Sequence, residues 1–123
     1  MSTIRLKRAY DPPEAADGAR VLVDRLWPRG LSREKSRIDL WLKDAAPSAA
    51  LRTWFGHRPE RFAEFSRRYE MELAALDAAL APLREMLAQG PLTLLFAAHD
   101  TEHNNAVVLA RFLRARPRPG RER

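Results

Sequence analysis

The sequence predicts a small α/β protein in which a three-stranded, largely parallel, Rossmann-like sheet is packed by helices. Two observations support this class: three short apolar segments have strand patterns, and helical patterns lie between and after them. The length of 123 residues fits one domain with its own core. We expect that domain to cover residues 1–114. Residues 115–123 alternate arginine with proline and have no apolar face, so we expect a disordered basic tail.

The three strands are predicted from their apolar patterns. Residues 4–8 alternate the apolar Ile4 and Leu6 with basic side chains, as in a strand with one solvated face. Residues 19–25 contain an unbroken Val-Leu-Val, and residues 92–98 read LTLLFAA, so we expect both segments to be buried on two faces. Only ten residues separate the first two strands, which leaves open whether that pair is parallel or antiparallel.

Short helices are predicted after the second strand. Ser32 is a plausible cap for a polar turn. The apolar residues Ile38, Trp41 and Leu42 then lie at helical spacing, in a segment that the next proline ends. Ser48 caps a further short helix, which a glycine closes eight residues later.

Two longer helical segments follow. The first begins near Pro59 and carries an apolar stripe at spacings of three and four residues, which we expect to pack on the protein's own sheet. Pro82 kinks or restarts this helix. The last helix is predicted from about Glu102 to Arg114, with its cap within residues 100–101.

Polar side chains follow each predicted strand, and parallel strands would bring them to one edge of the sheet. Ligands of open parallel α/β sheets bind beyond the carboxyl ends of the strands. The candidate ligand-binding residues are Tyr10, Asp11, Arg25, Trp27, Arg29, Arg52, Asn104 and Asn105, and the candidate catalytic residues are Asp24 and Asp100. For Tyr10 and Asp11 the alternative is a turn tied to its neighbour.

The arginines in this set favour a small anionic ligand, either a phosphate or a carboxylate. Arg25, Arg29 and Arg52 can bind such a group through planar, bidentate hydrogen bonds. Trp27 can stack on a ring or cap the core. The structural alternative is an Asp24–arginine pair that fixes the loop beneath a buried tryptophan.

The other polar residues also have two interpretations. Asp24 and Asp100 are candidate general bases, although the sequence leaves open whether there is a reaction. Asn104 and Asn105 lie at the start of the last helix, where asparagine is a poor helix former. Either asparagine would hydrogen-bond a ligand at the helix start or bond to the neighbouring loop.

No cofactor and no metal are predicted. The sequence has no cysteine and no glycine-rich phosphate loop. Residues 99–103, HDTEH, match the zinc-peptidase string H-x-x-E-H. That chemistry needs both histidines on one face of a continuous helix, whereas we expect His99 to lie before the helix begins.

Composition and charge indicate which partners the protein has and where in the cell it is located. No apolar run approaches the roughly 20 residues of a membrane span, and the N-terminus has no secretory pattern, so we expect a cytoplasmic protein without a membrane partner. The net charge is +6, of which residues 114–123 contribute +4 through five arginines and one glutamate. A nucleic-acid partner bound through this tail is one alternative function. A non-catalytic interaction domain, with its contact surface on the helices of residues 41–55, is another.

Four segments resemble the YeaO-like branch of the family known as domain of unknown function 488. They are KRAYDPPEAADGARVLVDRLWPRG, WLKDAAPSAALRTWFGH, RFAEFSRRYEMEL and PLTLLFAAHDTEHNNAVVL, and they run from about Ile4 to Leu113. The resemblance implies a small bacterial α/β protein and assigns no reaction. Its pattern is matched at Tyr10, Asp11, Asp17, Gly18, Arg20, Asp24, Arg25, Trp27, Pro28, Arg29, Gly30, Pro47, Ser48, Arg52, Phe65, Tyr69 and Asn104.

A longer branch of the same family differs after the last strand. That branch carries a cysteine there and a His-Arg pair beyond it, whereas this chain has Ala97-Ala98 and Asn104-Asn105. The resemblance therefore transfers no cysteine-dependent activity.

Overall fold

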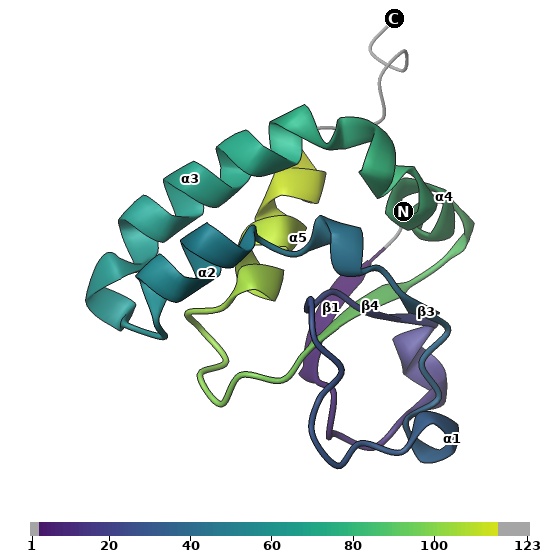
Figure 1. Cartoon of the computed structure of the whole chain (residues 1–123). Helices are drawn as coiled ribbons and strands as arrows, with labels where there is room; N and C mark the ends of the chain where they lie inside the picture. Colours follow the sequence, from purple (N-terminus) through teal and green to yellow (C-terminus); the bar gives the residue numbers. More distant parts are fainter. Residues whose placement is uncertain (1–2, 116–123) are drawn as a thin grey trace, which may run out of the picture.

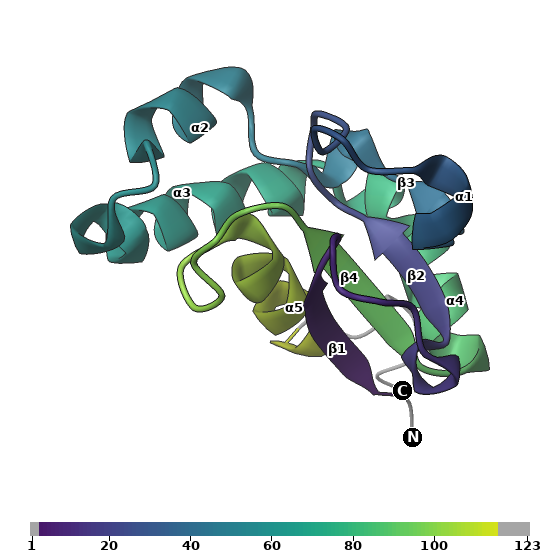
Figure 2. The same cartoon turned by 90° about the horizontal axis from the view of Figure 1, so that it is seen from below.

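The computed structural model describes residues 3–115 and has one parallel sheet with helices packed against it (Figure 1). Within these residues the sheet has four strands, in the spatial order β1 (Ile4–Arg8), β4 (Leu92–Phe96), β2 (Ala19–Leu22) and β3 (Leu40–Trp41). All neighbouring pairs are parallel, which confirms the predicted α/β class and its parallel sheet. β1 and β2 are also parallel to each other, because β4 lies between them and pairs with both (Figure 2).

The sheet has one strand more than predicted, because Leu40 and Trp41 pair with β2. The helix predicted through Ile38, Trp41 and Leu42 is therefore wrong. Apolar spacing over so short a segment fits a helix or a strand, and tertiary contacts decide between them. Here the Trp41 indole Nε1 donates a hydrogen bond of 2.8 Å to the backbone oxygen of Asp24, which holds the segment beside the end of β2.

The helices of the described residues are α1 (Arg33–Ser36), α2 (Ala49–Phe55), α3 (Phe62–Ala75), α4 (Ala81–Gln89) and α5 (Asn105–Ala115). The Ser32 hydroxyl accepts a hydrogen bond from the backbone N–H of Lys35, and the Ser48 hydroxyl accepts one from that of Leu51, so both predicted caps are confirmed. Short 3₁₀ turns precede α3 and α4, and the predicted restart at Pro82 falls in the first turn of α4.

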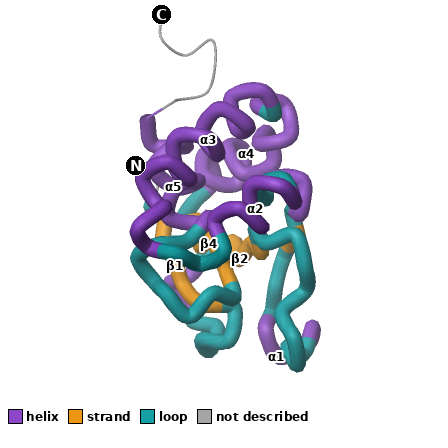
Figure 3. Tube along the Cα trace, turned by 60° about the vertical axis from the view of Figure 1, so that its left-hand side comes forward, coloured by secondary structure: helices purple, strands orange, loops and turns teal. Residues whose placement is uncertain are grey.

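Different parts of the chain cover the two faces of the sheet. In Figure 3 the longer helices lie on one side of the strands, and the loops around α1 lie on the other. On one face, Val21, Leu94 and Phe96 join the core formed with α3, α4 and α5. On the other face, Leu22 and Leu95 pack with Trp41 of β3 and with loop residues. These loop residues are Ala9, Trp27, Leu31 and Ile38. The segments after β1 and β2 therefore cover one face, and the helices after β3 and β4 cover the other.

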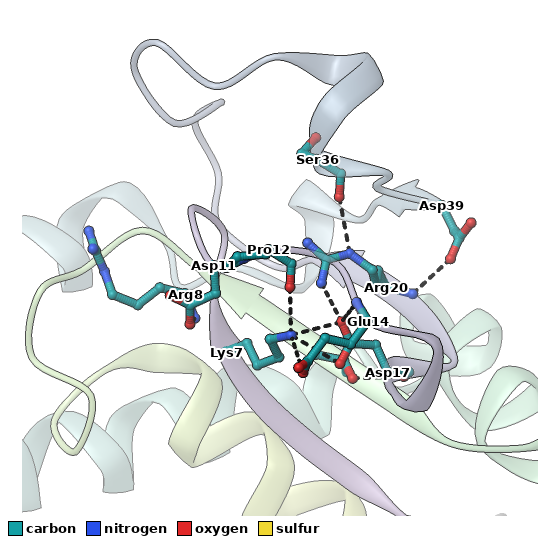
Figure 4. Close-up of polar contacts among 10 residues, drawn as sticks. Lys7, Arg8, Asp11, Pro12, Glu14, Asp17, Arg20, Ser36 and Asp39 are labelled. Atoms are coloured by element: carbon teal, nitrogen blue, oxygen red, sulfur yellow. Dashed lines mark hydrogen bonds and ion pairs between the residues drawn. The ribbon is translucent and has the colours of Figure 1, made fainter.

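A buried ion cluster lies on the face opposite the long helices (Figure 4). The Asp17 side chain has no exposed surface, and its carboxylate accepts hydrogen bonds from Lys7 Nζ at 2.9 and 3.1 Å and from Arg20 Nη1 at 2.6 Å. The backbone N–H of Glu14 donates a further bond of 3.0 Å to the same carboxylate. The Thr93 hydroxyl donates to the backbone oxygen of Asp17, which ties the cluster to β4.

Arg20 extends this cluster to the segment before β3. Its Nε donates to the Ser36 backbone oxygen at 3.0 Å, and its backbone N–H donates to the Asp39 carboxylate at 2.8 Å. The cluster thus joins β1, the turn before β2 and the approach to β3. Asp17 and Arg20, which the family resemblance marked, have this structural role and lie away from the cavity described below.

Two further expectations concern membrane spans and the C-terminal tail. None of the helices within residues 3–115 is long and apolar enough to span a membrane. The tail predicted to be disordered, residues 115–123, lies outside the described residues except for Ala115, which ends α5.

Candidate functional site

The neighbouring strands β2 and β4 send their following segments to opposite faces of the sheet. The segment after β2 packs through Trp27 and Leu31 against one face, whereas α5, which follows β4, packs through Val108 and Leu109 against the other. Such a divergence opens a crevice at the carboxyl ends of the two strands, which is where ligands bind in open α/β sheets.

Asp24 joins the two strand ends at the base of this crevice. Its carboxylate accepts a hydrogen bond of 2.9 Å from the backbone N–H of Ala97 and one of 3.1 Å from Asn105 Nδ2. The same Asn105 amide nitrogen donates to the Val23 backbone oxygen at 3.0 Å. Asp24 therefore connects the end of β2 to the end of β4 and to the first turn of α5. Within the described part of the chain it forms no ion pair with an arginine, so the predicted structural alternative is absent there.

A cavity of about 630 Å³ lies above this junction. It is lined by eight of the ten candidate residues: Asp24, Arg25, Trp27, Arg29, Arg52, Asp100, Asn104 and Asn105. The loop after β2, helix α2, the loop after β4 and the first residue of α5 supply them. The parallel sheet thus brings together side chains that are more than 80 residues apart in the sequence, as with Asp24 and Asn105.

Tyr10 and Asp11 do not line the cavity. The Tyr10 hydroxyl donates a hydrogen bond of 2.8 Å to the backbone oxygen of Arg29, and the Asp11 carboxylate accepts one of 3.0 Å from the backbone N–H of Arg8. The Arg8 guanidinium donates to the backbone oxygens of Ala97 and Ala98. These contacts match the predicted alternative of a turn tied to its neighbour, and they support the cavity loops from outside.

The three arginines that line the cavity differ from other arginines of the protein. Arg20, Arg67 and Arg68 form ion pairs with carboxylates. Among residues 3–115, no side-chain hydrogen bond or ion pair engages the guanidinium groups of Arg25, Arg29 or Arg52. Arg25 differs from the other two arginines because its Nε–H is buried and has no hydrogen-bond partner in the described structure.

Helix α2 places Arg52 in the cavity. The Ser48 hydroxyl caps the helix and donates a 2.6 Å hydrogen bond to the Glu72 carboxylate, which also accepts from the Ser48 backbone N–H at 2.8 Å. The first turn of α2 is thereby fixed to α3. Arg52 follows one turn later, with its backbone N–H bonded to the Ser48 oxygen at 2.9 Å, so its side chain starts from a rigid position.

The two candidate bases have different environments. Burial raises the pKa of the Asp24 carboxyl, although the Ala97 and Asn105 hydrogen bonds and the positive charge of Arg52 partly offset the effect. The backbone N–H groups of Glu102 and His103 bond to one oxygen of Asp100, and the His103 ring nitrogen lies 2.9 Å from the other. The Glu102 hydrogen bond is the largest contribution to a lowered pKa of Asp100. Asp100 therefore fixes its own loop.

Asn104 caps the last helix, which corrects two predictions. The helix begins at Asn105 and not at Glu102, because the preceding residues form the turn around Asp100. Its cap is Asn104, whose Oδ1 accepts from the backbone N–H of Val107 at 3.1 Å, and not a residue of 100–101. Asn104 is nearly fully buried, and its Nδ2 donates to the Asp100 backbone oxygen at 2.8 Å. Its amide therefore bonds to its own loop, which was the structural alternative.

Trp27 packs with Leu22 and Leu95 on the sheet face opposite the long helices, and it also lines the cavity. Its Nε1 donates to the Leu31 backbone oxygen at 2.9 Å, and its ring meets Trp41 edge to face with centroids 5.5 Å apart. The Arg33 guanidinium lies 4.1 Å from the Trp27 ring centroid, which places a cation over one face of the indole.

Several residues of the cavity wall were absent from the prediction. They are Leu26, Pro28, Pro47, Phe55, His57, Phe65, Ala97, Ala98 and His99. Phe55 and Phe65 have the helical spacing of ordinary core residues, so their pattern carries no sign of a cavity. His57 follows Gly56 with a left-handed φ of 59°, a conformation that a sequence pattern does not reveal.

The described residues contain no group of three or more His, Asp or Glu side chains placed to hold a metal ion. Residues 99–103, which match the zinc-peptidase string, lie before α5 and form the turn around Asp100. The continuous helix that this string requires is therefore absent at these positions.

The chain is similar to a known protein family and to several bacterial proteins. Residues 3–119 match the family DUF488-N3i, described as the inactive DUF488-N3 subclade. The chain is 43% identical over 113 residues to the uncharacterized protein Rv3073c of Mycobacterium tuberculosis H37Rv, a match that covers 92% of this chain and 95% of the relative. It is also 43% identical over 112 residues to the uncharacterized protein YeaO of Escherichia coli K12, covering 91% and 97%. No solved structure gives a significant match.

Proposed function

This chain belongs to the DUF488 family, in the subclade described as inactive, and we propose that it binds a small anionic ligand without converting it. The family expected from the four quoted segments is confirmed by this membership. The proposed ligand carries a phosphate or a carboxylate, and it binds at the carboxyl edge of the sheet between the loops after β2 and β4.

The observation that carries the proposal is the set of arginines Arg25, Arg29 and Arg52 in one cavity without protein partners in the described structure. A buried guanidinium N–H without an acceptor costs free energy, so a site that leaves one unpaired is suited to an incoming acceptor. Planar guanidinium groups bind phosphate and carboxylate oxygens in pairs.

The hydrogen bonds that the carboxylates of Asp24 and Asp100 form within the protein favour binding without turnover. Asp24 accepts hydrogen bonds from Ala97 and Asn105, and Asp100 is engaged within its own turn. These hydrogen bonds stabilise the charged form of each carboxylate and so make it a weaker base than it would be without them. The chain also has no cysteine for a thiolate mechanism, in keeping with the description of its subclade.

Thermal unfolding in the presence of anions tests the proposal. Phosphate, sulfate and acetate, each in excess of its dissociation constant, should raise the melting temperature, because a ligand that binds only the folded state stabilises it by mass action. At 100 times the dissociation constant the gain is about 2.7 kcal/mol. Sodium chloride at matched ionic strength is the control. Equal melting temperatures in all four salts would contradict the proposal.

The other expectations remain predictions. The nucleic-acid alternative depends on a tail that is almost wholly outside the described residues. The interaction-surface alternative loses part of its basis, because Trp41 lies in β3 and not on a helix. A cytoplasmic location is proposed from the sequence arguments above.

A further inference from the structure

We infer that the ligand carries an aromatic ring attached to its anionic group, with an aryl phosphate monoester as the best match to the site. The inference rests on the proposed anion site and adds the chemical class of the rest of the ligand. Two features carry it: the size of the cavity and its aromatic wall.

The cavity is too large for a bare anion. Its volume of about 630 Å³ lies in the range of pockets that hold whole organic ligands, roughly 300–1,000 Å³. A phosphate bound by Arg25, Arg29 and Arg52 would occupy only a small part of it. The remaining space must be filled by water or by another part of the ligand.

The wall of that remaining space is aromatic and apolar. Phe55 of α2 and Phe65 of α3 line the cavity, and their rings stack with centroids 4.3 Å apart. Their exposed fractions are only 5% and 2%, so they form a firm wall that is continuous with the core. The indole of Trp27 and the ring of Pro47 also line the cavity.

Such walls favour an aromatic group over water. Water at an apolar wall finds few hydrogen-bond partners, whereas a planar ring can meet aromatic walls in offset or edge-to-face contacts. Guanidinium planes also stack on aromatic rings, so the arginines that bind the anion can contact the ring beside it.

Leu26 lies at the edge of the cavity and offers a position at which the inference can be tested. Its side chain is 64% exposed, although it lies between Arg25 and Trp27 and lines the cavity. A bound ring that extends to this edge would cover Leu26.

Calorimetric titrations of matched phosphate esters test the inference. Phenyl phosphate should bind at least roughly tenfold tighter than methyl phosphate, because only the former buries a ring at the apolar wall. It should also bind tighter than cyclohexyl phosphate, which has a similar size but no aromatic face. Leu26→Ala should reduce the preference for phenyl over methyl phosphate. The matched control is Met71→Ala on α3, which is 63% exposed and does not line the cavity.

Each outcome separates this inference from the proposed function. If methyl and phenyl phosphate bind equally, the anion site stands and the inference about the ring is overturned. Equal binding of cyclohexyl and phenyl phosphate would restrict the preference to apolar groups in general and overturn the aromatic class. If no ester binds, the proposed function fails together with the inference. An equal effect of Leu26→Ala and Met71→Ala would place the ring elsewhere and also overturn it.

Discussion

Asp17→Asn will lower the free energy of unfolding by about 3 kcal/mol at neutral pH. The carboxylate is fully buried and accepts hydrogen bonds from Lys7, Arg20 and a backbone N–H. Removing one partner of a buried ion pair typically costs roughly 3–5 kcal/mol, because the remaining charge loses its compensation. The lower end applies here because Lys7 keeps some contact with water. Urea denaturation followed by circular dichroism measures the change.

Glu14→Gln is the matched control for Asp17→Asn. Glu14 contacts the same Lys7 Nζ, at 3.1 Å, but its side chain is 65% exposed. Exposed ion pairs contribute little, so this variant should differ from the wild type by less than about 1 kcal/mol. Similar losses in the two variants, or a loss below about 1 kcal/mol for Asp17→Asn, would contradict the structural role given to the buried cluster.

The same cluster sets the direction of acid unfolding. Burial alone would raise the pKa of the Asp17 carboxyl, but the hydrogen bonds from Lys7, Glu14 and Arg20 outweigh it and lower the pKa below its ordinary value of 3.8. A lowered pKa in the folded state stabilises the protein above pH 3.8, and this contribution is lost as the pH falls through the folded-state value. Asp17→Asn should therefore show a smaller loss of stability in that pH range than the wild type.

The double variant Arg29→Ala, Arg52→Ala will bind phosphate at least about 100-fold more weakly than the wild type. Hydrogen bonds to charged groups contribute roughly 1.5–3 kcal/mol each, and 2.7 kcal/mol corresponds to about two factors of ten in affinity. Both side chains are exposed and, among residues 3–115, unpaired, so we expect the variant to fold normally. Isothermal titration calorimetry with inorganic phosphate measures the loss.

The control for the arginine variant removes the same charge elsewhere. Arg5 and Arg111 are exposed and lie outside the cavity, so Arg5→Ala, Arg111→Ala changes the net charge equally. Its phosphate affinity should stay close to that of the wild type. If both double variants lose affinity to the same extent, the protein attracts phosphate through its overall charge and the cavity is not the site.

Much of the fold followed from local patterns. The three main strands were predictable because unbroken apolar segments such as Val21-Leu22-Val23 are typical of buried parallel strands. The caps at Ser32 and Ser48 were predictable because their side chains act within one turn. The short strand β3 was not, because two residues carry too little pattern and its pairing depends on β2.

The position of the cavity was predictable, but the roles of its residues were less so. Parallel strands bring their carboxyl ends together, which placed Asp24, Arg25 and Arg29 near Asn105. The sequence left open whether Asn104 binds a ligand or a loop, and it contained no sign that Asp24 connects two strand ends instead of pairing with an arginine. These roles depend on contacts across more than 70 residues or on the exact start of a helix.

The most direct test of the anion site is an NMR titration that follows the side-chain Nε–H of Arg25. This group is buried in the cavity loop and has no hydrogen-bond partner among the described residues, so it should report an incoming acceptor. With increasing phosphate, we predict that its resonance shifts and saturates, while that of the exposed Arg111 does not. An unchanged Arg25 signal, or equal and unsaturated shifts of both arginines, would contradict an anion site at the carboxyl edge of the sheet.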